Sequence, residues 1–285
     1  MSNKSTQTTT DKITKIFYLA ALSQLAAAGC GTWLGNPKDP TKPSTGATAT
    51  SEVSLSFDSQ GGGLTLTQPS IKVTGRNGQT IGSIVLSEAR VVLGEIKIKT
   101  ASDEQEARES FNGPFIVDLI SHSAAPKPEV ITLAGGTYKH IDLKLRKLED
   151  GQANGILADG DPLRNKSIHL RGVYTASTST ATPQALDMSF DLDEQFALNR
   201  NAAVTVDTKV TNNIIIAFDL DRWFDFSGRE ADLTDLGIQT ITLDKDSKER
   251  SSTVRQAIKE NIKGSSKFGK DVDHDGRLGT KEREN

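Results

Sequence analysis

Apolar and polar residues alternate along most of the chain beyond residue 51, which is the pattern of strands with one buried and one solvated face. The clearest run is residues 141–145, in which Ile141, Leu143 and Leu145 alternate with Asp142 and Lys144. Similar runs predict strands around residues 53–57, 64–66, 71–73, 81–86, 91–98, 115–119, 130–133, 168–170, 186–192, 214–220 and 238–243. The period of two therefore predicts an all-β protein.

Turn residues between these runs indicate how consecutive strands connect. Asn77-Gly78 separates two apolar runs and favours a hairpin whose two-residue turn has positive φ at both positions. A change in the phase of the alternation near Gly94 predicts a β-bulge. The expected fold is a β-sandwich of Greek-key or immunoglobulin-like type.

The 285 residues suffice for one large β domain or two smaller ones, and we favour two sandwich halves. Residues 149–166, rich in Gly, Asp and Asn, are expected to connect an N-terminal β-sandwich at 52–148 to a second β-rich half at 167–245. Residues 246–285 are predicted to hold a helix and a loop. Thr253 with Gln256 matches a capping box at the start of that helix, and an apolar stripe follows at helical spacing: Val254, Ala257, Ile258 and Ile262.

The first 51 residues have a different pattern. A basic stretch with Lys4, Lys12 and Lys15 precedes an apolar run at 16–28, and small residues lead up to Cys30. This order predicts a signal peptide at 1–29, and residues 25–30 resemble the lipobox of bacterial lipoproteins, which implies lipidation of Cys30 and a membrane anchor. Residues 30–51, mostly Gly, Pro, Ser, Thr and Ala, would form a flexible tether. The alternative is an N-terminal helix packed in a core with a buried free cysteine.

Residues 271–282 carry the sharpest chemical signal. Asp271, Asp273 and Asp275 alternate before a glycine, and Glu282 closes the segment at the twelfth position, as in an EF-hand calcium loop. Alternate residues of a tight loop point inward, so these carboxylates and the Arg277 carbonyl are predicted to bind Ca²⁺. Only three residues follow Glu282 in this sequence, so we expect weak, stabilising binding. The alternative is a solvated acidic tail.

Two weaker patterns stand in the second half of the chain. The letters Phe-Asp-Leu-Asp occur twice, and if the two predicted strands were neighbours a second acidic patch would arise from Asp191, Asp193, Asp219 and Asp221. We favour two separate wet strand faces instead. Trp223 and Phe224 are either packed in the core or exposed as an aromatic platform for sugars, and we favour packing.

Charge and composition exclude several classes of function. The net charge is −3 and basic residues are spread along the chain, which argues against a nucleic-acid partner. A single cysteine allows no intramolecular disulfide, and the four histidines lack paired metal-ligand spacing. We find neither a nucleophile elbow nor a phosphate-binding Gly-rich loop, so we do not expect an enzyme.

A family resemblance lies between residues 115 and 145. Residues 117–120, Val-Asp-Leu-Ile, and residues 136–145, Gly-Thr-Tyr-Lys-His-Ile-Asp-Leu-Lys-Leu, resemble an uncharacterised family of secreted and lipid-anchored bacterial and archaeal β domains. The resemblance implies a β-sandwich outside the cell and transfers no catalytic residue. Tyr138 in its turn is expected to be structural.

Together these patterns predict a lipid-anchored protein of the outer membrane or cell surface, with a structural or binding role and a C-terminal calcium site. Gly31, rather than an aspartate, follows Cys30, which favours the outer membrane. The first alternative is a carbohydrate- or envelope-binding module. The second is a hydrolase that uses two of the clustered aspartates as acid and base.

Overall fold

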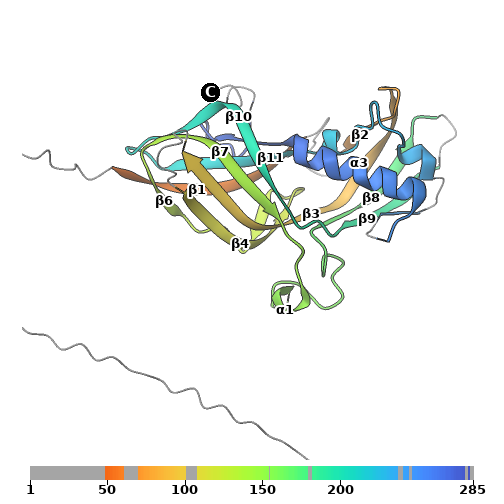
Figure 1. Cartoon of the computed structure of the whole chain (residues 1–285), viewed down its shortest axis with the longest axis horizontal. Helices are drawn as coiled ribbons and strands as arrows, with labels where there is room; N and C mark the ends of the chain where they lie inside the picture. The colour runs from red at the N-terminus through yellow and green to blue at the C-terminus, as the bar shows by residue number, and fades with distance from the viewer. Residues whose placement is uncertain are drawn as a thin grey trace, which may run out of the picture. The chain divides into compact units, whose positions relative to one another are not determined.

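A computed structural model describes residues 49–60, 70–100, 108–153, 155–178, 182–236, 240–243, 246–279 and 282. Residues 47–285 form one compact unit (Figure 1). The predicted signal peptide, Cys30 and nearly all of the tether lie outside the described residues, and so does the predicted strand at 64–66. Within the described part of the chain, no helix is both long and apolar enough to cross a membrane.

Strands dominate the chain, as the period of two predicts. They are β1 (Thr50–Gln60), β2 (Ser70–Thr74), β3 (Thr80–Thr100), β4 (Arg108–Asp118), β5 (Ser123–Ala125), β6 (Ile131–Ala134), β7 (Gly136–Leu145), β8 (Ile168–Ala176), β9 (Gln184–Phe190), β10 (Glu194–Val206), β11 (Asn212–Asp219), β12 (Thr240–Leu243) and β13 (Ser266–Lys270). The helical segments are α1 (Asp150–Ala153), α2 (Leu220–Trp223), the 3-10 turn η1 (Leu233–Leu236) and α3 (Glu249–Ser265).

The strands form two sheets. One has four strands in the order β13-β11-β1-β6, and the other has nine, with the path β10-β7-β3-β8-β9-β12 and with β2, β4 and β5 attached through β3 and β4. The inner faces of both sheets share one apolar core, to which Phe57, Leu93 and Phe218 contribute fully buried rings or side chains. The expected all-β, sandwich-like fold with a C-terminal helix is confirmed.

Strand β7 shows how the sequence pattern becomes a buried face. Ile141, Leu143 and Leu145 are buried, as their alternation predicts. Asp142 was expected on the wet face, yet it is only 6% exposed. It lies 2.7 Å from the Lys99 ammonium group and accepts a hydrogen bond from Gln195, because β7 has a strand on each side. Side chains of the two neighbouring strands thus bury one position on a face that the sequence marks as polar.

The predicted hairpin and bulge are both present. Strands β2 and β3 pair antiparallel, and the register of β3 shifts between Leu93 and Glu95, around Gly94. The predicted turn type is wrong, because of its two central residues only Gly78 has positive φ, at 77°. The hydrogen bond from the Gly75 amide to the Gln79 carbonyl closes a wider loop than a two-residue turn.

Residues 149–166 do not separate two sandwich halves. Strand β8, which follows them, pairs with β3, and β3 also pairs with β7, which precedes them, so both sides of this segment share one sheet. The segment folds over the outer face of β3 and encloses a small second core of Val92, Ile116, Leu148, Ala153 and Leu163. Figure 1 shows α1 and α3 on opposite sides of β3.

Helix α3 closes the other side of the core. The four apolar stripe residues Val254, Ala257, Ile258 and Ile262 are buried, as predicted. The predicted capping box is wrong, because the helix begins one turn earlier, at Glu249, and the Thr253 hydroxyl donates to the Glu249 carbonyl. The helix ends at Ser265.

Candidate metal centre

The C-terminal loop begins where β13 leaves the four-stranded sheet. Strand β13 pairs antiparallel with β11, from Phe218 opposite Ser266 to Ile214 opposite Lys270. The Asp271 amide continues this ladder by donating to the Asn213 carbonyl at 3.0 Å. The first predicted ligand is therefore fixed to the sheet by its own backbone.

Asp271, Asp273 and Asp275 come together as the spacing predicts. Each offers one carboxylate oxygen, and these oxygens lie within 4.8 Å of one another. Gly276 adopts φ of 74°, which supplies the sharp turn between the third aspartate and the rest of the loop. This group of three acidic side chains could hold a metal ion.

The first aspartate has a buried oxygen without a donor. Asp271 is 3% exposed, and its Oδ2 accepts hydrogen bonds from Asn213 Nδ2 at 2.9 Å and from the Gly276 amide at 3.3 Å. Its Oδ1 is buried and has no hydrogen-bond partner. Leaving a buried charged acceptor unsatisfied costs about 1–3 kcal/mol or more, and a bound cation would remove that cost.

Glu282 departs from its predicted role. It is buried, but it lies outside the group of three aspartates, and its two oxygens accept hydrogen bonds from the Val272 and Gly279 amides at 2.6 and 2.7 Å. The Arg277 carbonyl accepts a hydrogen bond from the Gly279 amide at 3.2 Å. The structure therefore brings together three of the four predicted carboxylate ligands, while backbone amides engage Glu282 and the Arg277 carbonyl.

The far end of the loop is held by β1, which the sequence analysis missed. The Leu278 amide donates to Asp58 Oδ2 at 3.1 Å, and its carbonyl accepts from Gln60 Nε2 at 2.7 Å. The Leu278 side chain is 2% exposed and packs on Ile215 and Ala217 of β11. A polar Asp-Ser-Gln ending to an otherwise alternating strand was the available signal, but nothing in it indicates a partner 220 residues away.

The four aspartates of the repeated letters do not form a second patch. The two repeats lie at the ends of β9 and β11, which belong to different sheets, and in each the second aspartate lies beyond the strand. Their neighbours differ accordingly: Asp191 pairs with Arg255, Asp193 lies 3.8 Å from Lys144, Asp219 lies 3.7 Å from Arg222, and Asp221 accepts from the Lys72 amide. The two repeats are therefore not neighbours in one sheet, as the favoured alternative expects.

The proposed aromatic platform is part of the core. Trp223 and Phe224 are both fully buried. The Trp223 indole packs edge-on against Phe218, with ring centroids 6.2 Å apart, and its Nε1 donates to Ser265 Oγ at 2.8 Å. The Trp223 side chain therefore joins α2 to β11 and α3. Neither aromatic side chain is available to stack on a sugar.

A serine, a histidine and an aspartate meet at the end of β1. Ser59 Oγ lies 3.0 Å from His122 Nε2, and His122 Nδ1 lies 3.8 Å from Asp58 Oδ1. The order resembles that of a hydrolytic triad, but Ser59 is 2% exposed and its hydroxyl donates to the Leu119 carbonyl at 2.5 Å. A nucleophile needs a reachable hydroxyl. The group links β1 to the loop after β4, with Ser59 and Asp58 buried and His122 partly exposed.

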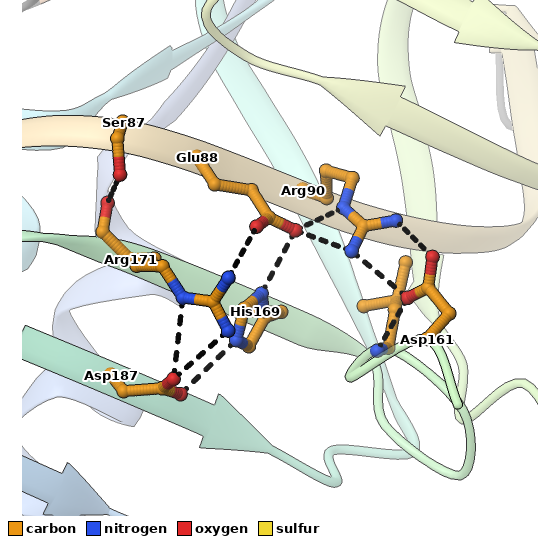
Figure 2. A network of polar contacts seen from close by, with 8 residues as sticks. Ser87, Glu88, Arg90, Asp161, His169, Arg171 and Asp187 are labelled. Carbon is orange, nitrogen blue, oxygen red and sulfur yellow. Dashed lines mark hydrogen bonds and ion pairs between the residues drawn. The ribbon is translucent and has the colours of Figure 1, made fainter.

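Figure 2 shows a larger polar network on the outer face of β3, β8 and β9. Its centre is His169, which is fully buried, with Nδ1 at 3.0 Å from Glu88 and Nε2 at 3.1 Å from Asp187. Arg90 makes two hydrogen bonds to Asp161 at 2.8 and 2.9 Å and also contacts Glu88. No pattern in the sequence singled out these residues as a group.

Charged groups in this network shift the pKa values of their neighbours. Burial alone would raise the pKa of Asp161, but hydrogen bonds from Arg90 and the Leu163 amide, with the charge of Arg90, hold it below its ordinary value. Burial alone would lower the pKa of Arg90, but Asp161 and Glu88 raise it. The pair is therefore ionised at neutral pH and fastens residues 149–166 to the sheet.

Comparison with known proteins adds little. No family model matches the sequence, and no curated protein matches it. Among solved structures, the chain is similar to MbnP from Methylosinus trichosporium, with a TM-score of 0.34 and 12% sequence identity over 78% of this chain and 99% of that one. A function has therefore to be inferred from this chain's own residues.

Proposed function

We propose that this protein is a lipid-anchored, extracytoplasmic β-sandwich with a structural or binding role, which binds Ca²⁺ at residues 271–282. The observation that supports the site is the buried Asp271 Oδ1, which has no hydrogen-bond partner, on a residue that belongs to a group of three close carboxylates. A cation at this position is favoured because it would offset the repulsion among the three carboxylates and would contact the oxygen that has no hydrogen-bond partner.

The donor set favours calcium over other metals. All three clustered ligands are carboxylates, whereas zinc and copper sites in proteins normally include imidazole or thiolate ligands. Ca²⁺ accepts about six to eight oxygens in a flexible arrangement, while Mg²⁺ requires near-ideal octahedral geometry. Asp273 and Asp275 are exposed, so water can complete the shell. We expect a dissociation constant on the order of 0.1–1 mM, typical of extracellular modules.

The anchor and the location rest on the N-terminal sequence. The basic stretch, the apolar run and Cys30 support secretion and lipidation, and the resemblance around residues 117–145 supports a place outside the cell. The carbohydrate-binding alternative has lost its aromatic platform, since Trp223 and Phe224 are buried. The proposal assigns no catalytic residue.

Calorimetric titration tests the metal site. The chain from residue 30, with Cys30→Ser to prevent lipidation, is titrated with Ca²⁺ and separately with Mg²⁺. We expect Ca²⁺ binding in the range given above, at least tenfold weaker binding in Asp273→Asn, and no change in Asp193→Asn, an exposed aspartate outside the loop. Equal binding by Asp273→Asn, or no binding by the parent protein, would show that the loop is not a calcium site.

Lipid labelling tests the anchor. Cells that express the full chain are supplied with a labelled fatty acid, and the Cys30→Ala variant serves as the control. Label in the parent chain and none in the variant is expected. An unlabelled parent chain that still leaves the cytoplasm would show a secreted protein without an anchor.

A further inference from the structure

We infer that the calcium loop is not self-contained but is completed by one polar face of β1, so that the ion fastens the C-terminal segment to the first strand of the sheet. We call this face the β1 stripe and define it as Ser54, Ser56, Asp58 and Gln60. The inference rests on the proposed calcium site and extends it. It assigns the β1 stripe and Asn213 as positioning residues.

The β1 stripe follows from the geometry of the strand. Successive side chains of a strand point to opposite faces, so the four stripe residues share one face while Val53, Leu55 and Phe57 enter the core. Strand β1 pairs in parallel with β11, which places Ser54 directly opposite Asn213. Strand β13, from which the loop continues, pairs with the other edge of β11.

The first two residues of the β1 stripe, Ser54 and Ser56, orient the first predicted ligand, Asp271, through Asn213. The Ser54 hydroxyl donates to Asn213 Oδ1 at 3.1 Å, and Asn213 Nδ2 donates to Ser56 Oγ at 3.1 Å and to Asp271 Oδ2 at 2.9 Å. These partners fix which end of the amide faces Asp271. Since Oδ2 is engaged by Asn213, the buried Oδ1 is the oxygen left for an ion.

The last two residues of the β1 stripe, Asp58 and Gln60, hold the end of the loop at Leu278. Asp58 Oδ2 accepts from the Leu278 amide, and Gln60 Nε2 donates to the Leu278 carbonyl. Asp58 is 3% exposed, so its carboxylate adds a buried negative charge beside an already acidic loop. A cation in the loop relieves this repulsion, while without one the same charges oppose closure of the loop onto β1.

Ion binding should therefore stabilise β1, although β1 is far from the loop in sequence. We expect Ca²⁺ to slow amide hydrogen exchange at residues 52–60 as well as at residues 271–279. We also expect positioning by Asn213 to matter for affinity although Asn213 is not a ligand. A loop that bound its ion alone would show neither effect.

The experiment measures Ca²⁺ affinity by calorimetry and hydrogen exchange with and without Ca²⁺ in the chain from residue 30 with Cys30→Ser. Asn213→Ala and Gln60→Ala are compared with Asn112→Ala, a strand asparagine of the other sheet. Asp58→Asn is compared with Asp58→Ala, because the amide keeps an acceptor for the Leu278 amide. Melting without Ca²⁺ shows whether each variant folds.

We expect Asn213→Ala to bind Ca²⁺ at least tenfold more weakly and to lose the Ca²⁺-dependent protection of residues 52–60, with a smaller loss of both in Gln60→Ala. Asn112→Ala should match the parent protein, and Asp58→Asn should bind better than Asp58→Ala. If Asn213→Ala and Gln60→Ala bind as tightly as the parent while Asp273→Asn does not bind, the loop is self-contained and the inference is overturned, although the calcium site stands. If the parent protein itself binds no Ca²⁺, the proposed function fails and the inference fails with it.

Discussion

The ion pair between Arg90 and Asp161 offers a quantitative test of how residues 149–166 are held. The pair has two charge-assisted hydrogen bonds, of 2.8 and 2.9 Å, between side chains that are 18% and 15% exposed. Asp161→Asn removes the charge but keeps an oxygen that can accept from the Leu163 amide. The perturbation therefore isolates the pair rather than the turn.

The expected magnitude follows from these contacts. Hydrogen bonds to charged groups contribute about 1.5–3 kcal/mol when one partner is removed, and Arg90 keeps its contact with Glu88. We expect Asp161→Asn to lower the free energy of opening of residues 149–166 by about 2 kcal/mol. Opening exposes a small core around Leu148 and Leu163 and leaves the large core intact, so the effect should be local.

Hydrogen exchange measures this opening directly. The Leu148 amide donates to Lys166 and the Asn165 amide donates to Leu148, so both amides report on closure of the segment. About 2 kcal/mol corresponds to roughly 30-fold faster exchange at these two amides, with no change in β11. A double-mutant cycle with Arg90→Gln should give a coupling energy of about 1–2 kcal/mol.

The same pair predicts a pH dependence. The folded-state pKa of Asp161 is lowered, so its contribution is complete above the ordinary carboxyl pKa of about 4 and is lost as the pH falls through the lower folded-state value. Protection of the Leu148 amide should therefore decline with acid in the parent protein and stay flat in Asp161→Asn. Unchanged exchange in Asp161→Asn at pH 7 would refute the assignment of the pair as the fastening of this segment.

Three further outcomes are expected. At 10 mM Ca²⁺, a dissociation constant of about 0.1–1 mM gives about 1.4–2.7 kcal/mol of stabilisation, a rise in melting temperature of about 3–10 °C by scanning fluorimetry, and no rise would contradict the site. Ser265→Ala leaves the buried Trp223 Nε1 without its hydrogen-bond acceptor and should lower the free energy of unfolding in urea by about 1–3 kcal/mol. An unchanged midpoint would show that this hydrogen bond is dispensable. Glu194→Gln removes the shared partner of Lys259 and Lys263. Burial would raise the pKa of Glu194 but the two lysines lower it. A loss of about 1 kcal/mol at pH 7 should therefore shrink as the pH falls below the ordinary carboxyl pKa and vanish below the lower folded-state value, and a loss that persists in strong acid would point to packing instead.

Local patterns in the sequence were sufficient for several elements. The period of two predicts the strands, the phase change predicts the bulge at Gly94, and the stripe from Val254 to Ile262 predicts the buried side of α3. The alternating aspartates predict the group of three in the C-terminal loop. Each of these features depends on residues within one turn, strand or helix. The residues that cause it therefore lie close together in the sequence, where a local pattern can show them.

Other local patterns misled because their outcome depends on distant partners. The sequence of Thr253 and Gln256 matches a capping box, yet the helix begins at Glu249. Residues 149–166 have the composition of a linker, yet they cover the outer face of β3 because apolar residues such as Leu163 find partners there. Composition does not show whether a loop has a surface on which to pack.

The sequence by itself determined that this chain forms half-buried strands, a single amphipathic helix near its end and an acidic loop with the spacing of a calcium site. Only the tertiary structure decided that β1 lies beside β11, that the β1 stripe faces the loop, and that Asn213 leaves one oxygen of Asp271 without a donor. The physical reason is that alternation fixes which residues share a face of a strand, whereas the neighbour across that face is set by long-range pairing in the folded sheet.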